Sequence, residues 1–311
     1  MLNAEHSSPE RRKAHDPVMN TALLKEKLDA LYVNYDRSYL STDPLLFLHN
    51  HDDPADVEVI GLLASSLAYG HVKMIQRNIR RVLALMGGRP ARYVRNFDAR
   101  SRARDFSDIC HRFNRGPDIV LLLHYIKQMM EADGSIGEFF RAGFNPGAQT
   151  IEHSLSSFVE RTLALDCTPI YPGGTLPKDA RVRFFFPSPS GGSACKRLNL
   201  FLRWMVRCGD MLDVGLWDFV SPSQLVIPLD THIARIAPLI GLTKRKTAGW
   251  LMAVEITENL KKLDPFDPVK YDFALCRLGI LDKCPKSPHL TTCQKCEIGS
   301  LCMRGPSRTG P

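Results

Sequence analysis

Four of the nine cysteines lie within nineteen residues near the end of the chain, at Cys284, Cys293, Cys296 and Cys302. Thiolates this close in sequence can converge on one soft metal centre. Structural zinc usually draws on two close cysteine pairs, and only one Cys-x2-Cys pair is present here. The spacing therefore favours a 4Fe-4S cluster over the alternative, a zinc ion with His289 replacing one cysteine.

A second candidate for chemistry is Lys196, which follows Gly191-Gly192-Ser193 and opens a stretch with helical apolar spacing. If Ser193 is the N-cap, Lys196 lies in the first helical turn. The positive helix end and the adjacent Arg197 then favour the neutral amine. A neutral amine can attack the C1′ atom of a flipped nucleotide's sugar and form a Schiff base. A lysine that grips a phosphate or simply faces solvent is the alternative.

The third candidate is Asp230, which follows the apolar string LVIPL and precedes a helical run. We expect it to cap that helix through its first-turn amides, and capping alone would account for the residue. If the carboxylate also faces a pocket, it can stabilise an oxocarbenium-like sugar and take a proton from a lysine. The two roles are compatible.

Positive charge is concentrated in one part of the chain. The net charge is +8, and the stretch from His71 to Arg115 holds twelve Lys/Arg against three Asp/Glu. Arg77, Arg80 and Arg81 share one helix face by spacing, which indicates a polyanionic partner such as nucleic acid. A solvated basic helix is the alternative. His71 begins this helix and could line a base pocket, wedge a duplex, or be a surface histidine.

Hydrophobic periodicity predicts the elements that position these residues. We find no strand-like alternation and no internal repeat, so the fold class is all-α. One long loop, 166–194, interrupts the helices, with one possible short strand at 181–186. The predicted helices span 20–35, 57–69, 71–86, 118–132, 151–165, 195–207, 230–240, 244–263 and 267–279.

Composition sets broader limits. The hydrophobic content of 44% and charged content of 24% are ordinary for a globular protein. No apolar run reaches the length of a membrane span, and the N-terminus lacks a secretory core. An odd number of cysteines argues against a secreted disulfide framework. We therefore expect a cytoplasmic monomer without a membrane partner.

Two strings next to these candidates resemble a known superfamily. VIPLDTHIARIAPLIGL and SGGSACKRLNLFL, followed by a quartet ending x2-Cys-x5-Cys, resemble the helix–hairpin–helix DNA glycosylases, particularly endonuclease III. The resemblance implies a two-lobed helical fold, a nucleophilic Lys196, a catalytic Asp230 and a phosphate-binding hairpin at Gly191 and Gly192. It also implies double-stranded DNA with a damaged base as substrate.

The sequence departs from that pattern in three places. The first cysteine gap is eight residues where endonuclease III has six, and the hairpin lacks a second glycine at the usual spacing. The gap of 34 positions from Lys196 to Asp230 is similar in length to the gap in the archaeal 8-oxoguanine glycosylase branch. The same stretch also resembles an uncharacterised conserved family.

These features predict disordered tails at 1–18 and 303–311, a two-lobed helical core at 19–283 and a cluster loop at 284–302. The function that we expect is a bifunctional DNA glycosylase with lyase activity. A non-catalytic nucleic-acid-binding protein on the same scaffold is the first alternative. A cluster-based redox or sensing protein is the second, although no nucleotide or flavin fingerprint accompanies the cysteines.

Overall fold

The computed structural model describes residues 20–281, 283–287 and 289–303. The tails predicted at 1–18 and 303–311 lie outside these residues, except for Met303. Helices account for 59% of the chain and strands for 1%, which confirms the all-α prediction. The strands of the described part form one antiparallel hairpin, β1 (Cys110–His111) and β2 (Asn114–Arg115).

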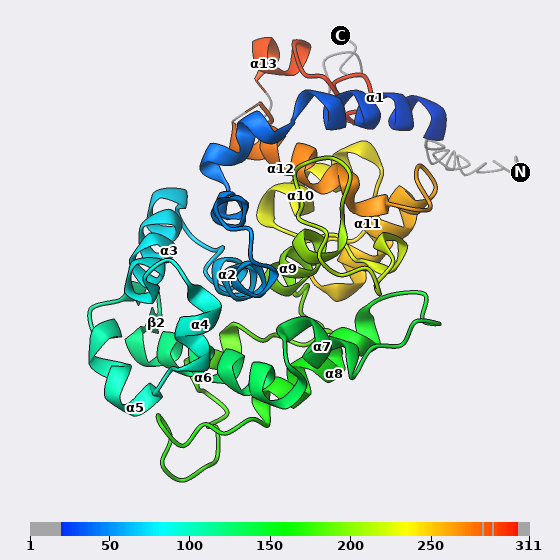
Figure 1. Ribbon diagram of the computed structural model, residues 1–311. Coiled ribbons are helices and arrows are strands. Elements are labelled where there is room, and N and C mark those ends of the chain that lie inside the picture. The colour runs from blue at the N-terminus through cyan, green and yellow to red at the C-terminus, as the bar shows by residue number, and fades with distance from the viewer. Residues whose placement is uncertain (1–19, 282, 288, 304–311) are drawn as a thin grey trace, which may run out of the picture.

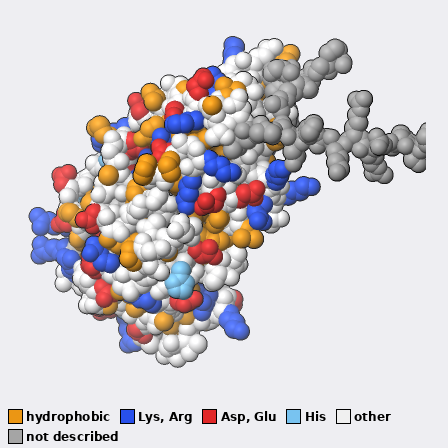
Figure 2. All heavy atoms as spheres, turned by 90° about the vertical axis from the view of Figure 1, so that its right-hand side faces the viewer, with side chains coloured by type: hydrophobic (Ala, Val, Ile, Leu, Met, Phe, Trp, Pro, Cys, Tyr) orange, Lys and Arg blue, Asp and Glu red, His pale blue; other side chains and the backbone are white. Residues whose placement is uncertain are grey.

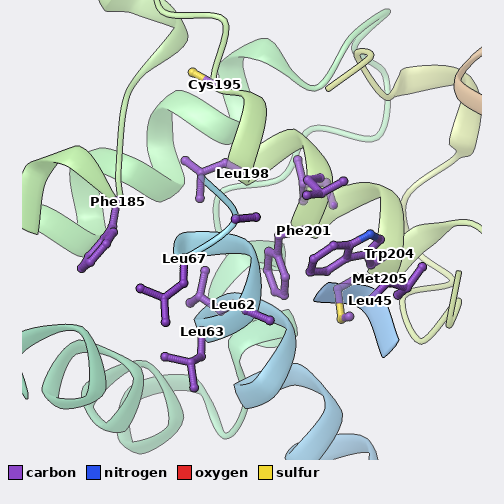
Figure 3. Close-up of a cluster of buried hydrophobic side chains, with 14 of the residues drawn as sticks. Leu45, Leu62, Leu63, Leu67, Phe185, Cys195, Leu198, Phe201, Trp204 and Met205 are labelled. Carbon is purple, nitrogen blue, oxygen red and sulfur yellow. The ribbon is translucent and has the colours of Figure 1, made fainter. Parts of the chain in front are cut away.

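Two helices pack against each other at the centre of the molecule. They are α2 (Pro54–Ser66) and α9 (Lys196–Val206). Phe201 and Met205 of α9 meet α2 in a buried apolar cluster (Figure 3). A Cβ atom on Gly61 would lie 2.9 Å from Met205 Cε and 3.1 Å from a Phe201 ring carbon. The absence of a side chain at Gly61 therefore lets the two helices approach closely.

A first group of helices lies on one side of this pair (Figure 1). The predicted helices at 71–86, 118–132 and 151–165 are confirmed within this group, whereas α4, α5 and α7 were not predicted because they are too short to show periodicity. The group consists of α3 (Val72–Met86), α4 (Pro90–Arg95), α5 (Ala99–Arg102), η3 (Ala103–Phe106), α6 (Gly116–Asp133), α7 (Ile136–Arg141) and α8 (Glu152–Leu163).

A second group lies on the other side of the pair, where α1 packs on α12 and the start of the described chain approaches its end (Figure 1). Both groups share one hydrophobic core, and the division into two lobes stays a prediction. This second group consists of α1 (Thr21–Asn34), η1 (Arg37–Thr42), η2 (Pro44–Asn50), η6 (Pro222–Gln224), α10 (Thr231–Ile236), η7 (Ala237–Ile240), α11 (Trp250–Lys261), η8 (Pro268–Tyr271), α12 (Asp272–Ile280) and α13 (Leu290–Gln294).

The long loop contains two short 3-10 helices, η4 (Arg181–Phe184) and η5 (Pro189–Gly191). The strand predicted at 181–186 is wrong. Its backbone closes i to i+3 hydrogen bonds, such as that from Phe185 N–H to the Val182 carbonyl, and so buries Val182 and Phe185 without a strand partner. The helix predicted from residue 244 begins only at Trp250.

A network of buried ion pairs connects α9 to the second group. Arg203 on α9 donates to Asp213, at 3.0 Å, and to Asp272 on α12. Arg207, the C-cap residue of the same helix, pairs with Asp213 and, at 2.9 Å, with Asp267. Buried charges are tolerated when they are paired in this way, so the network fixes α12 against α9.

None of the helices within the described ranges has the length and apolarity needed to cross a membrane.

Candidate functional site

The Asp230 carboxylate begins α10 and uses both of its oxygens. Oδ1 accepts the backbone N–H of Ile233 at 2.7 Å, so the predicted helix cap is confirmed. Oδ2 accepts the thiol of Cys276, on α12, at 3.0 Å. The side chain is partly exposed, so this arrangement orients an accessible carboxylate from two sides.

Lys196 is the first residue of α9. The predicted N-cap at Ser193 is wrong, because Cys195 occupies that position with a left-handed φ of 46° and the Ser193 hydroxyl accepts the Cys195 N–H. The Lys196 amine donates to the Ala68 carbonyl at 2.9 Å, in the turn that follows α2. This bond anchors the amine beside the α2–α3 turn.

Cys276 is the hydrogen-bond partner of Asp230, and no spacing or motif in the sequence singled it out. Burial raises the pKa of its thiol well above the usual value, the Asp230 and Asp272 carboxylates raise it further, and the positive charge of Lys196 opposes them. The thiol therefore stays a protonated donor to Asp230, within the electrostatic field of Lys196.

Asp272 lies one helical turn before Cys276 on α12 and extends the site into the ion network. Burial is the main cause that raises the pKa of Asp272 to about 7; Arg203 opposes this shift, and Asp230 reinforces it. The carboxylates of Asp230 and Asp272 are thus electrostatically coupled, and Arg203 is the cation that lets both stay close.

Arg197 follows Lys196 and is almost completely buried. Its guanidinium donates to the carbonyls of Ser66 and Phe184, and it lies 3.7 Å from the centre of the Phe184 ring. Burial lowers the pKa of Arg197 to about 10, and Tyr69 partly offsets the effect. Through these two hydrogen bonds, Arg197 connects the long loop to the end of α2.

Three aromatic side chains from distant parts of the chain form what we call the aromatic surface: Tyr69, Phe113 and Phe184. The ring centres of Phe113 and Phe184 are 4.3 Å apart, and Tyr69 lies 4.9 Å from Phe184. Phe113 is 42% exposed and Phe184 37% exposed, which is unusual for phenylalanine next to a buried arginine. The sequence does not predict this surface, because the three residues are far apart in the chain and share no motif or spacing.

His111 supports the aromatic surface by a hydrogen bond to the backbone of Tyr69. Its fully buried ring contacts the Tyr69 carbonyl through Nε2 at 2.9 Å, and its Nδ1 lies 3.0 Å from the Asn78 amide nitrogen. Since the amide N–H₂ is a donor, Nδ1 accepts and Nε2 donates, which is the neutral form. Burial lowers the pKa of His111 and keeps it neutral.

The glycine hairpin predicted to contact phosphate is accessible. Gly191 and Gly192 are exposed, and a Cβ atom at either position would meet nothing within 4 Å. Gly192 adopts a left-handed φ of 75°, and its carbonyl accepts the Trp250 N–H at 3.0 Å, at the start of α11. The hairpin therefore rests on α11 and leaves its outer edge open.

The three predicted arginines lie on the exposed face of α3, as their spacing indicated. Arg81 is partly neutralised by Asp108 at 3.0 Å, while the Arg80 guanidinium lies 5.5 Å from the centre of the Phe47 ring. His71 is the exposed N-cap of α3, where its Nδ1 accepts the Lys73 N–H at 3.4 Å. This placement accounts for His71 as a surface cap.

The opposite side of the molecule differs in charge. Figure 2 views the molecule from the right of Figure 1, and on this face basic and acidic side chains are intermixed. The helices α3, α4 and α5, which hold most of the basic stretch, lie on the left of Figure 1. The charge asymmetry of the sequence is therefore also an asymmetry of the fold.

The four clustered cysteines line one cavity of about 40 Å³. Arg235 of α10 closes one side: it lies 3.1 Å from Cys284 Sγ and donates to the Cys284 carbonyl at 2.7 Å. Burial first, and then the three other thiols, raise the pKa of Cys296. No group of three or more His, Cys, Asp or Glu in the described ranges is arranged to hold a single metal ion.

Fold and site together define an all-helical protein in which Asp230 is hydrogen-bonded to the Cys276 thiol, and in which Lys196 precedes the arginine that contacts an exposed aromatic surface. The chain belongs to the family described as "Protein of unknown function (DUF2400)", whose model matches residues 43–281. The cysteine quartet lies beyond the matched residues. Comparisons with curated proteins and with solved structures give no match.

Proposed function

We propose that the protein is a bifunctional DNA-repair glycosylase that excises a damaged base from double-stranded DNA. The observation that carries the proposal is that Cys276 orients Asp230, at the start of α10, and that the charge of Lys196, at the start of α9, acts on the same thiol. An attack on the C1′ atom of a sugar requires two groups, a nucleophilic amine and an oriented carboxylate.

In the proposed reaction the lone pair of the Lys196 amine attacks C1′, and the glycosidic bond breaks with its electron pair leaving on the base. Asp230 stabilises the positive charge that develops on the sugar and accepts the proton that the lysine nitrogen loses. The C1′–O4′ bond then opens, O4′ takes that proton from Asp230, and a protonated Schiff base results. Loss of a 2′ proton expels the 3′ phosphate and cleaves the strand.

The aromatic surface supports a nucleic-acid substrate. Exposed phenylalanine rings offer a stacking platform for bases, because every base has a π-face. Phe184 is fastened beside Lys196 by Arg197, so the platform and the amine belong to one rigid assembly. Bases displaced from the duplex would therefore stack next to the nucleophile.

The quartet fits a 4Fe-4S cluster by its donor chemistry, since four thiolates that surround one cavity can each bind a separate iron. Cys284, Cys293, Cys296 and Cys302 would hold the group. Bound there, it would tie the end of the chain to α10 through Arg235 and stabilise the fold. A zinc ion is the alternative, which metal analysis distinguishes.

The proposal is tested by borohydride trapping on duplexes that carry a panel of lesions. We expect a covalent adduct with the unaltered protein and with Lys178→Ala, an exposed lysine of the long loop, but none with Lys196→Ala. Asp230→Asn keeps the helix cap and should slow excision by about a hundredfold or more. An equal adduct with Lys196→Ala would exclude the lyase mechanism.

A non-catalytic nucleic-acid-binding protein is the second candidate. The observation that favours it is that the Lys196 amine and both Asp230 oxygens already make structural hydrogen bonds. This candidate predicts salt-sensitive binding of DNA that Asp230→Asn leaves unchanged, without excision of any base.

A further inference from the structure

A hollow of about 300 Å³ lies where the end of α3 meets α4 and α5, and none of the residues assigned above lines it. Its lining includes three arginines, Arg89, Arg92 and Arg102, together with Tyr93 and Asn96. The basic stretch of the sequence passes through this part of the fold, and the α3 arginines named above do not line the hollow. The hollow therefore needs its own explanation.

The arginines of the hollow carry little compensating negative charge. Arg89 and Arg92 are exposed, and the structure gives neither of them an ion pair with any described residue. Arg102 pairs with Asp105 at 3.3 Å on the exposed surface. Three guanidinium groups around one concavity repel each other and favour an anion between them.

Tyr93 also lines the hollow, but its hydroxyl oxygen is shielded from solvent. The donors that the hollow offers to an anion are therefore its arginines.

We propose that this hollow binds a phosphate group, with Arg89, Arg92 and Arg102 as charged donors. Phosphate fits because it offers several acceptor oxygens and because arginine binds it with two parallel hydrogen bonds. The phosphate can belong to a free ion or to a nucleic-acid backbone. The inference does not rest on the glycosylase activity.

The first test uses inorganic phosphate and pyrophosphate, titrated calorimetrically into the whole protein at low ionic strength. The variant Arg89→Gln/Arg92→Gln is compared with Arg95→Gln/Arg104→Gln, which removes two exposed arginines that do not line the hollow. Both variants lose the same charge. For a free-ion site we expect saturable binding that weakens about tenfold or more in the hollow variant alone.

The second test titrates a short DNA duplex against the same variants over a range of salt concentrations. If the phosphate belongs to a nucleic acid, the free ions show no saturable binding, and the duplex affinity falls about tenfold only in the hollow variant. Its salt slope should then drop by about one for each lost phosphate contact. Equal losses in the two variants, or no loss in either test, would overturn the proposal.

Discussion

The cysteine quartet and the group formed by Lys196, Cys276 and Asp230 are assembled in opposite ways. The thiols of the quartet come from one stretch of nineteen residues, and they line a cavity together with Arg235, Ile236, Leu239 and Ile240. The second group comes from the ends or interiors of α9, α10 and α12. The first group therefore takes its reactive atoms from one local segment, whereas the second depends on how three helices pack.

The two regions nevertheless share their supports. Asp230 and Arg235 are the two ends of one short segment, with Asp230 directed at Cys276 and Arg235 at Cys284. Gly279 on α12 contacts α10 so closely that a Cβ atom there would lie 2.2 Å from the His232 ring. The two regions thus differ in how they are assembled. Both contact α10, so a structural change in one region can alter the other through this helix.

The largest effect should follow from breaking the ion network that holds α12 against α9. Arg203→Met leaves Asp213 and Asp272 buried without this partner, and we expect a loss of about 3–5 kcal/mol in the free energy of unfolding, measured by urea titration. The exposed Arg141→Met should cost at most about 1 kcal/mol. Metal content of the quartet should not change; if it falls equally, the two regions are not independently assembled.

The converse change removes one thiol of the quartet. With the proposed metal bound at the quartet, Cys296→Ala should abolish metal binding and expose the amides of this segment to hydrogen exchange, because the binding energy of the metal would be folding energy of the segment. Amides of α2 and α9 should keep their protection. Cys208→Ala, an exposed cysteine elsewhere, serves as the control. Loss of protection across α2 and α9 would contradict the local origin of the quartet.

The aromatic surface should respond to pH through His111. Its pKa is lowered by burial, so the unfolded chain binds the proton more tightly than the folded protein does. Stability contributed by the neutral ring is present above about pH 6.5 and is lost as the pH falls toward the lowered pKa, by at most about 1.4 kcal/mol per pH unit.

The measurement is the unfolding free energy between pH 7.5 and 5. His153→Gln, which alters an exposed histidine, should keep this slope. His111→Gln should reduce it. If His111→Gln has the same slope of unfolding free energy against pH, another titrating group causes the pH dependence. The quartet would then be the next region to examine.

The smallest effect concerns the Cys276 thiol, which donates to Asp230. Cys276→Ala removes the donor to Asp230 Oδ2 and should cost about 1 kcal/mol, or about a fivefold slower formation of the borohydride adduct. Cys276→Ser restores a donor and should recover most of the rate. Equal rates in both variants would mean that the capping bond from Ile233 alone orients the carboxylate.

Much of the secondary structure could be predicted from the sequence, because helix periodicity is a local property. The helices at 20–35 and 57–69 are confirmed with shifts of a few residues at their ends. The strand at 181–186 failed for a physical reason: apolar residues in a short run bury equally well in a 3-10 turn. Such a run has no intrinsic preference strong enough to decide between the two.

The sequence by itself determined that the fold is helical, that Asp230 caps a helix and that four thiols lie close together, since each follows from neighbours within a few residues. Only the tertiary structure decided that Cys276 faces Asp230 and that Tyr69, Phe113 and Phe184 meet. Those contacts join residues tens of positions apart. The first contact depends on the packing of α10 against α12, and the second on where the chain after α2, the β1–β2 hairpin and the long loop meet. No local signal encodes such packing.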